Sequence, residues 1–374
     1  MLYQTHLVIH LDHIRANLMA IRGAVGPDRK LLIAVKANAY GHGAVAVSRM
    51  AESAGVDWLG VATVPEAMQV REGGIGLPIL KLSPAFPEEM GAALDASLTL
   101  AVCDRANALA LEAVCAARAA AAPVHLVIDT GMARIGVQPL EAPGLAAFLA
   151  EHCPHLRIQG AFTHLPVSDE ADPTYTEAQI QRFRTAVAAV EAALGRRLEL
   201  VHCANSGAVL AHPEGFLDLV RPGIMIYGFY PDPGTPRSIP LLPGLSFLTR
   251  VGFLKKVTAG TRVGYGLTWT APEDTWIATL PVGYADGFNR LFSNRGRVLV
   301  GGRSYPVAGR VCMDQTMINL GPETDVQVGD EVVLIGRSGD ERITVDDWAM
   351  ALGTITYEVT CQINARVERI YSGG

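Results

Sequence analysis

A lysine closes the first apolar run of the chain, in a position where it could do covalent chemistry. Lys36 ends the run LLIAVK (31–36), and lysine is scarce here, since only five of the 31 lysines and arginines are lysines. A lysine at the end of a strand often only extends its charge into solvent. If burial and cationic neighbours lower the pKa of such a lysine, its neutral amine becomes a nucleophile that forms a Schiff base with an aldehyde.

Eight short apolar runs could position this lysine and its partners. Ala-rich segments with helical spacing separate them, and such alternation predicts parallel strands joined by helical crossovers. Eight strands close a (β/α)8 barrel of the TIM type, which we favour over an open doubly wound sheet because the latter usually has fewer strands. The predicted strands are 31–36, 58–62, 78–82, 97–102, 123–129, 156–163, 198–203 and 217–221.

The clearest predicted helix covers residues 176–194. Thr176 and Gln179 have the spacing of a capping box at its start, and Gly195 stands where a terminating glycine belongs. The Ala-rich stretch 106–122 is also predicted as a helix, stopped by Pro123.

The pattern changes after residue 230. Residues 231–244 are dense in Pro and Gly and predict a linker. Beyond them, short alternating runs with turn signals predict an all-β module with one helical stretch, DDWAMALG (346–353). We therefore expect two domains, a barrel over residues 1–233 and a β-rich domain over residues 234–374.

Charge and cysteine spacing exclude several classes of function. A net charge of −6 argues against nucleic acid or an anionic membrane as a partner. The chain has no uninterrupted apolar segment long enough to span a membrane and no pattern of a signal peptide, so a cytoplasmic location is expected. The six cysteines form no CxxC pair, and no metal site is predicted.

Polar residues follow several of the eight runs, and the carboxyl ends of barrel strands are where active sites form. Phosphate commonly binds after the last two strands of such a barrel, where Asn-Ser-Gly and Pro-Gly-Ile occur in this chain. Ser206 could also be an ordinary helix cap. The candidate residues are Tyr40, Arg134, Thr163, His164, His202, Asn205, Ser206, Arg221, Gly223 and Ile224.

A phosphate site and a reactive lysine together suggest pyridoxal phosphate as the cofactor. Arg221 could then point at the pyridine nitrogen and keep it unprotonated, which favours returning a proton to the α-carbon over transamination. His202 could hold Arg221, and His164 could stack on the cofactor ring. A lone histidine on a strand is otherwise most often a satisfied core residue.

Taken together, the motifs resemble those of the alanine racemases, pyridoxal phosphate enzymes of the barrel class called fold type III. The resemblance runs from the start of the chain to its end. It rests on nine motifs in order, AVKANAYGHG, DTGMARIG, FTHLP, HCANSGA, RPGIMIYG, VGYGLTW, VGYADGF, GRVCMDQTMI and TITYEVTCQI.

The resemblance implies a role for each matching residue in interconverting L- and D-alanine, with D-alanine supplied for peptidoglycan. Lys36 would carry the cofactor and act as base on one face of the substrate. Tyr265 would act on the opposite face, from the partner subunit of a head-to-tail homodimer. Tyr40, Ser206, Gly223, Ile224 and Tyr357 would hold the phosphate, and Arg221 the pyridine nitrogen. His164 and Asn205 would add to the cofactor site. Arg134 and Met313 would bind the substrate carboxylate, with Cys312 and Asp314 beside Met313. Tyr284 and Arg290 would line the entry path.

One position departs from the family pattern. Many members have a lysine two residues before the Asp of the DTGM motif, modified to a carbamate that braces the arginine. Val127 stands at that position, so no carbamate can form. We expect a bound anion such as chloride, or another side chain, to orient Arg134 instead.

The sequence leaves four alternatives open. A racemase of wider range, for serine, lysine or arginine, would share these motifs. A barrel-fold decarboxylase would place an acidic residue at the pyridine nitrogen, where this chain has Arg221. A non-catalytic pyridoxal phosphate carrier would not need the β-module with Tyr265. In a purely structural protein, Lys36 would merely be exposed.

Overall fold

The computed structural model describes residues 2–373, and the chain divides into two compact units. Residues 14–242 form one unit, called here the barrel unit; residues 1–13 and 243–374 form the other, the β-rich unit. The first thirteen residues thus belong to the β-rich unit and not to the barrel, where the sequence prediction had them. The reason is pairing, because β1 (His6–His10) lies between β10 (Leu245–Arg250) and β20 (Glu368–Ser372).

The barrel unit has eight parallel strands in the order β8-β7-β6-β5-β4-β3-β2-β9. The gap between β8 and β9 is bridged by Arg221 N donating to Ala204 O at 2.8 Å, so the barrel is nearly closed. All eight predicted strands are present, and the barrel prediction is confirmed. The strands are β2 (Lys30–Ala34), β3 (Trp58–Val61), β4 (Ile79–Lys81), β5 (Leu98–Val102), β6 (Ala122–Val127), β7 (Leu156–Phe162), β8 (Leu200–His202) and β9 (Leu219–Val220).

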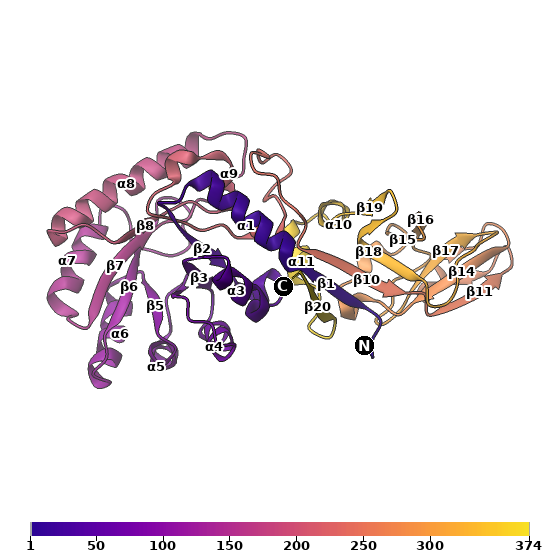
Figure 1. Cartoon of the computed structure of the whole chain (residues 1–374), viewed down its shortest axis with the longest axis horizontal. Helices are drawn as coiled ribbons and strands as arrows, with labels where there is room; N and C mark the ends of the chain where they lie inside the picture. The colour runs from indigo at the N-terminus through magenta and orange to yellow at the C-terminus, as the bar shows by residue number, and fades with distance from the viewer. Residues whose placement is uncertain (1, 374) are drawn as a thin grey trace. The chain divides into compact units, whose positions relative to one another are not determined.

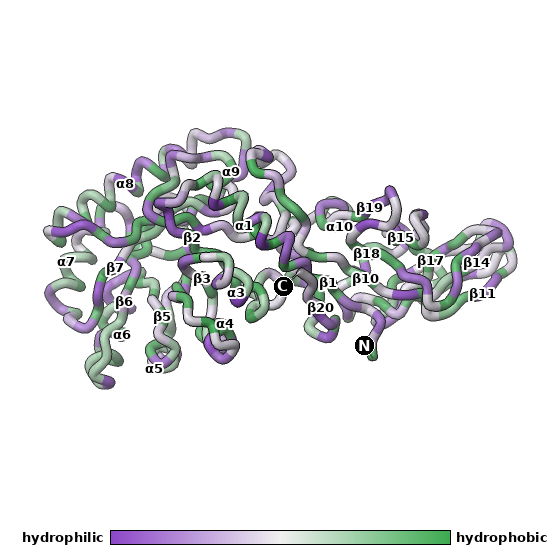
Figure 2. Tube along the Cα trace, viewed as in Figure 1, coloured by the Kyte–Doolittle hydropathy of each residue, from purple (hydrophilic) through white to green (hydrophobic). Residues whose placement is uncertain are grey.

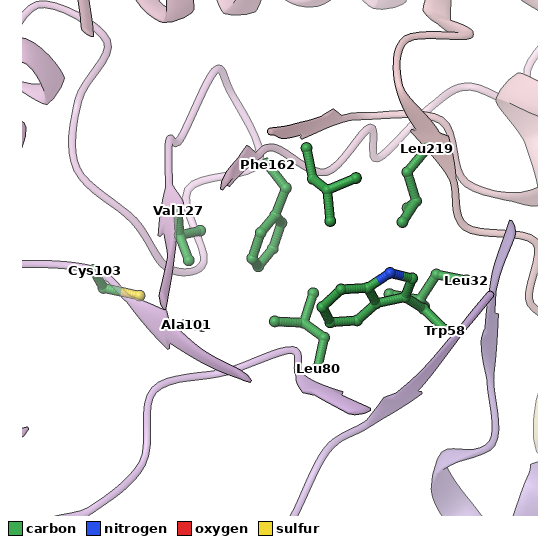
Figure 3. Close-up of a cluster of buried hydrophobic side chains, with 9 residues drawn as sticks. Leu32, Trp58, Leu80, Ala101, Cys103, Val127, Phe162 and Leu219 are labelled. Carbon is green, nitrogen blue, oxygen red and sulfur yellow. The ribbon is translucent and has the colours of Figure 1, made fainter. Parts of the chain in front are cut away.

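Helices cover the outside of this ring of strands (Figure 1). The helical elements of this part of the chain are α1 (Leu11–Val25), α2 (Lys36–Tyr40), α3 (Ala44–Ser53), α4 (Val64–Glu72), α5 (Pro87–Asp95), α6 (Arg105–Ala117), α7 (Ala142–His152), α8 (Thr174–Leu194) and α9 (Ser206–Ala211), with 3-10 turns η1 (Pro213–Gly215) and η2 (Ile224–Tyr227); α2 is a short turn after β2 and not one of the covering helices. Inside the ring, large apolar side chains such as Trp58 and Phe162 converge and fill the space (Figure 3). The barrel interior is therefore a packed core and not a pore.

Helix α8 shows why the helical prediction held and where it failed. Hydrophobic and hydrophilic residues alternate along it, with buried positions recurring every three or four residues (Figure 2). Gly195 ends it with φ 63°, as predicted. The predicted capping box is wrong: the helix begins two residues earlier, after Pro173, and Thr176 and Gln179 are buried. The amide of Gln179 donates to Thr130 instead, at 3.2 Å.

The β-rich unit contains a seven-stranded sheet, β16-β15-β18-β10-β1-β20 with β19 beside β18, and sheets of three strands, β11-β14-β17, and two, β12-β13. Its remaining strands are β11 (Phe253–Val257), β12 (Arg262–Val263), β13 (Trp269–Thr270), β14 (Thr275–Leu280), β15 (Arg297–Val300), β16 (Arg303–Pro306), β17 (Thr316–Gly321), β18 (Glu331–Ser338) and β19 (Glu341–Ile343), with 3-10 turns η3 (Tyr265–Leu267), η4 (Tyr284–Asp286) and η5 (Arg290–Phe292).

Between residues 243 and 373 the structure has two α-helices, α10 (Val345–Leu352) and α11 (Thr356–Cys361), where the sequence predicted one. The second was missed because TYEVTC is short and rich in β-branched and aromatic residues, which favour strands. Among residues 2–373, no helix is long and apolar enough to cross a membrane.

Candidate active site

Lys36 stands at a turn of uncommon geometry. Strand β2 ends at Ala34, two residues before the predicted end, and Lys36 opens α2. Residues 37–40 then have φ values of 50, 53, 54 and 52°, a single left-handed turn made without glycine. This conformation is costly for L-residues and persists only where surrounding contacts impose it.

Hydrogen bonds from both sides impose the left-handed turn. The Glu66 carboxylate accepts from Ala37 N at 2.7 Å, and Asn38 Oδ1 accepts from Ala44 N at 2.8 Å. Within the turn, Ala39 N donates to Val35 O at 2.8 Å. The backbone that carries Lys36 is therefore fixed, as a group that must present its amine in one direction requires.

Arg221 lies buried directly after β9 and is held from several directions. Its Nη1 donates to His202 Nδ1 at 2.8 Å, and its Nη2 donates to Thr163 O at 2.7 Å and Cys203 O at 3.1 Å. His202 Nε2 in turn lies 2.9 Å from His125 Nδ1. The predicted contact between His202 and Arg221 is present, while the sequence reasoning missed His125. Its signal was a histidine inside an otherwise apolar run.

The ionisation of this group follows from its burial. Burial lowers the pKa of Arg221 to about 10, which still leaves the guanidinium charged at neutral pH. Burial, and then the charge of Arg221, lower the pKa of His202 well below its usual value, and burial lowers the pKa of His125 to about 3. The two histidines are thus neutral. Arg221 donates a hydrogen bond to His202 Nδ1, and the protonated Nε2 of His202 donates one to His125 Nδ1.

His164 marks where the cationic groups of the barrel unit meet. Burial, followed by the charges of Arg221, Arg134 and Lys36, lowers the pKa of His164 to about 3. These three cations come from the loops after β9, β6 and β2, as expected for residues at the carboxyl ends of barrel strands. The site is therefore strongly positive and suited to an anionic ligand.

A small cradle forms next to these cations. Gly223 N donates to Ser206 Oγ at 2.8 Å, and a Cβ added to Gly223 would lie 3.0 Å from the Tyr40 hydroxyl oxygen. Ser206 is not the helix cap, because Asn205 caps α9 by accepting from Ala208 N at 3.1 Å. Two hydroxyl groups thus converge on a glycine that has no side chain to fill the space. The following residue, Ile224, opens η2.

The loop that carries Arg134 is ordered by Asp129. One oxygen of the Asp129 carboxylate accepts from the backbone amides of Gly131, Met132 and Ala133 at 3.0, 3.0 and 3.1 Å. Arg134 itself is exposed and makes no hydrogen bond or ion pair with any of residues 2–373.

Val127 belongs to the apolar core of the barrel, together with Cys103 and Phe162. Neither a carbamate nor another described side chain braces Arg134 in this structure, so a bound anion at this position stays a prediction.

Six predicted residues of the β-rich unit line one pocket of about 630 Å³. The sequence reasoning missed Arg310, Val311 and Gln315, which flank the predicted Cys312-Met313 pair and could have been found from the motif GRVCMDQTMI. Tyr357 does not line it and instead lies half-buried in α11. The lining residues are Tyr265, Tyr284, Arg290, Arg310, Val311, Cys312, Met313, Asp314 and Gln315.

Two glycines give Tyr265 its exposed position. Gly264 and Gly266 have φ values of 74 and 69°, which favour glycine. A Cβ on Gly266 would lie 2.8 Å from the Arg310 guanidinium, so the arginine packs closely against the turn. The Tyr265 side chain is 72% exposed. The sequence VGYGLT therefore builds a turn that holds a tyrosine out of the unit beside a cation.

Both parts of the chain match one family. The sequence models of the N-terminal and C-terminal domains of alanine racemase match residues 9–231 and 245–371. The chain belongs to the alanine racemase family. It is accordingly a racemase, which confirms the enzyme class that the sequence motifs predicted.

Relatives in this family are similar over their whole length. An alanine racemase of Cutibacterium acnes is 48% identical over 99% of this chain and 98% of its own. Among solved structures, an alanine racemase of Clostridium difficile 630 has a TM-score of 0.94 at 36% identity, covering 99% of this chain and 96% of its own. That of Bacillus anthracis, described with bound L-Ala-P, has a TM-score of 0.93 at 34% identity, covering 99% and 95%.

Proposed function

We propose that this protein interconverts L- and D-alanine with pyridoxal phosphate bound in the barrel unit, and so supplies D-alanine for peptidoglycan. The observation that carries the proposal is the buried, charged Arg221 anchored on neutral histidines. An acidic residue in this place would favour the decarboxylase alternative. The names of the relatives support alanine as the substrate.

The residues present fit this cofactor. The hydroxyl groups of Tyr40 and Ser206 lie around the small space at Gly223, whose amide donates to Ser206 Oγ, and hydroxyl groups can donate to a phosphate. Arg221 can only donate, so it would bind an unprotonated pyridine nitrogen. Tyr357 remains a proposed phosphate ligand by family resemblance alone. His164, at the meeting point of the cations, would lie beside the ring.

When bound, pyridoxal phosphate stabilises negative charge on the α-carbon of an attached amino acid. The chain itself must then move one proton off and another on, from opposite faces. Lys36, fixed on its left-handed turn, would carry the cofactor and take or give a proton on one face. Arg134 would hold the substrate carboxylate.

The second proton-transfer group would come from another subunit. Tyr265 is presented outward on the β-rich unit beside Arg310, in a pocket that also contains Met313 and Cys312. Several large apolar side chains near this pocket are exposed, including Tyr265, Leu267, Tyr284, Leu291 and Met313. We infer that a second copy of the chain covers them in a head-to-tail homodimer, placing Tyr265 on the face of the substrate opposite to Lys36.

Deuterium exchange tests this proposal directly. The purified holoenzyme is incubated in D2O with L-alanine and, in a separate reaction, with D-alanine, alongside Lys36→Ala and Tyr265→Phe. We expect the native protein to form D-alanine with α-deuterium, Lys36→Ala to form none, and Tyr265→Phe to exchange only one enantiomer. Lys255→Ala, on an exposed position of β11, is the matched control and keeps full activity.

The other outcomes separate the parts of the proposal. A protein that turns over serine or lysine but not alanine would keep the cofactor assignment and lose the substrate assignment. A protein that stays colourless after addition of pyridoxal phosphate would contradict the cofactor assignment itself. Exchange of both enantiomers by Tyr265→Phe would exclude the two-base mechanism.

A further inference from the structure

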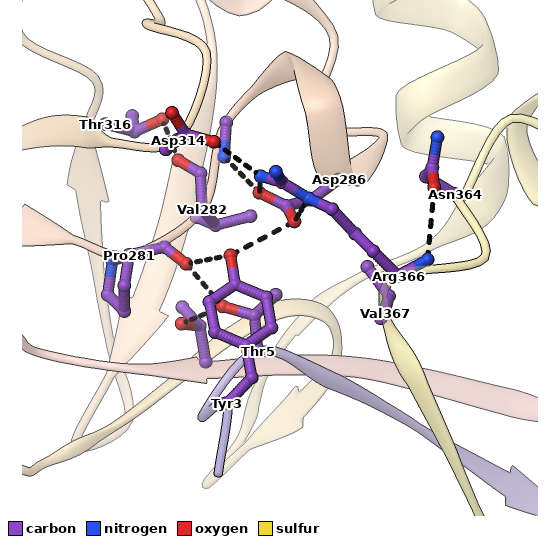
Figure 4. Close-up of polar contacts among 12 residues, drawn as sticks. Tyr3, Thr5, Pro281, Val282, Asp286, Asp314, Thr316, Asn364, Arg366 and Val367 are labelled. Atoms are coloured by element: carbon purple, nitrogen blue, oxygen red, sulfur yellow. Dashed lines mark hydrogen bonds and ion pairs between the residues drawn. The ribbon is translucent and has the colours of Figure 1, made fainter.

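A buried carboxylate in the β-rich unit is held by residues that the proposed chemistry does not use. Asp286 is fully buried, and its oxygens accept from the Tyr3 hydroxyl at 3.0 Å and from Gly283 N at 2.9 Å. The Arg366 guanidinium donates to the same carboxylate through Nε at 2.7 Å and Nη2 at 3.0 Å. Figure 4 shows the guanidinium alongside this carboxylate. Such complete pairing is what a buried charge requires.

The turn that contains Asp286 is interlocked with a wall of the pocket. Tyr284 N donates to Cys312 O at 3.0 Å, and Ala285 N donates to Met313 O at 3.1 Å. Gly283 lies so close that an added Cβ would be 2.3 Å from both of these carbonyl oxygens. Any shift of the turn must therefore shift the segment of Cys312 and Met313, both of which line the pocket.

Arg366 adds a second connection to the same wall. Its Nη2 donates to Asp314 Oδ1 at 2.8 Å, so one guanidinium joins the buried Asp286 to the pocket-lining Asp314 (Figure 4). The pair with Asp314 is largely exposed and contributes little to stability. Its geometry, however, fixes the residue next to Met313.

We propose that Arg366 is a positioning residue, which holds η4 and the Cys312–Asp314 segment in one arrangement so that Met313 and Tyr284 receive the substrate. The inference rests on the proposed function and deepens it, because it names a residue outside the pocket that controls substrate binding. A guanidinium is needed, since only its planar fork can reach both carboxylates at once.

Arg366→Lys tests this role without removing the charge. We expect KM for alanine to rise by roughly tenfold and kcat to fall by less than about threefold, because a loosened wall weakens binding before it affects proton transfer. The ammonium can pair with Asp286 but cannot form the same fork. The bound pyridoxal phosphate per subunit stays unchanged, since the barrel unit would hold it.

A matched variant separates positioning from stability. Tyr3→Phe removes one hydrogen bond from the same Asp286 carboxylate but leaves the link between Asp286 and Asp314 intact. It should lower the melting temperature and leave KM unchanged. If Tyr3→Phe raises KM as much as Arg366→Lys, or if Arg366→Lys leaves KM unchanged, the positioning role is wrong. Arg303→Lys, in the exposed Arg303–Asp325 pair, is the surface control.

A double-mutant cycle shows whether Arg366 acts through Asp314. Asp314→Asn and Arg366→Lys should together raise KM by clearly less than the product of their separate effects, because both break one connection. If the two substitutions raise KM independently, Arg366 does not act through Asp314.

Hydrogen exchange separates failure of this inference from failure of the proposed function. If the native protein does not racemise alanine, the proposed function fails. Hydrogen exchange at the backbone amides of Tyr284 and Ala285 then tests whether Arg366 still positions this turn. Faster exchange at these amides in Arg366→Lys than in Tyr3→Phe would keep the positioning role, and equal exchange would overturn it.

Discussion

The two units of the chain present their candidate site residues in opposite ways. In the barrel unit, Arg221 is buried and hydrogen-bonded to His202 and to backbone carbonyls, and the backbone of Lys36 is held in a left-handed turn. In the β-rich unit, Tyr265 and Met313 are exposed around an open pocket. The barrel residues are thus ordered by their own unit, whereas we propose that the exposed ones are ordered by a second copy of the chain.

This contrast has an energetic consequence. Removing a buried, hydrogen-bonded group costs stability because its partners lose their only donor or acceptor. Removing an exposed hydroxyl costs almost none. Substitutions in the barrel site should therefore change activity and stability together, and substitutions in the β-rich pocket should change activity alone.

Tyr265→Phe should show the largest difference between its effect on activity and its effect on stability. We expect kcat for racemisation to fall by about 10³-fold, as for loss of a general acid–base group, and the free energy of unfolding to change by less than about 0.5 kcal/mol. Steady-state kinetics of the holoenzyme and urea denaturation measure the two effects. Tyr371→Phe, a partly exposed tyrosine of β20, is the control. A large loss of stability in Tyr265→Phe would break the comparison.

Arg221→Lys should lower both the activity and the stability of the protein. A lysine cannot reach His202, Thr163 O and Cys203 O together, so kcat should fall by roughly 10²-fold and stability by about 2 kcal/mol. Arg237→Lys, at an exposed position of the same unit, controls for the substitution. Loss of activity at unchanged stability would mean that the hydrogen bonds of Arg221 do not order the site.

The buried histidines predict a dependence of stability on pH. His125 has a pKa of about 3 in the folded chain and near 6.5 when unfolded, so between these values the unfolded state binds the extra proton. The stability from its neutral form is complete above pH 6.5 and is lost as the pH falls toward 3. In His125→Gln, the slope of unfolding free energy against pH should be shallower by about 1.4 kcal/mol per unit. Urea denaturation between pH 6 and 4 measures it, with His152→Gln on α7 as control. An unchanged slope would show that His125 does not stay neutral.

The repeating pattern of the barrel could be predicted from sequence, and so could the positions of several candidate site residues at its strand ends. Apolar runs at regular spacing predicted all eight strands, and the rule that sites form at strand ends then selected Lys36, Arg134, His164 and Arg221. These residues needed no knowledge of distant contacts, because strand order alone brings their loops together.

Contacts between distant residues could not be predicted in this way. Arg366 pairs with Asp286 across 80 positions, and neither stands at the end of a barrel strand. The pairing of β1 with β20 links the two ends of the chain, and no local pattern in the first ten residues indicates it. The left-handed turn after Lys36 was also hidden, since Ala37 and Ala39 favour ordinary helices and only surrounding contacts override that preference.

The loop of Arg134 tests the comparison between the two units with the smallest expected effect. Arg134 belongs to the barrel unit but is exposed like the pocket residues of the β-rich unit. Asp129 orders the loop through three backbone amides, but nothing among residues 2–373 fixes the guanidinium. Asp129→Asn keeps an acceptor oxygen and loses its charge, so the loop should loosen only slightly. We expect KM for alanine to rise about threefold at constant kcat.

Asp172→Asn provides the control for this last substitution. The Asp172 carboxylate also accepts from a backbone amide, that of Thr174 at 3.0 Å, but in an exposed turn before α8. It should leave KM unchanged. If Asp129→Asn also leaves KM unchanged, the loop does not limit how Arg134 meets the substrate. If KM rises and added chloride restores it, an anion braces the arginine where Val127 has replaced the lysine, and the barrel site depends on a group from outside the chain, as we propose for the β-rich pocket.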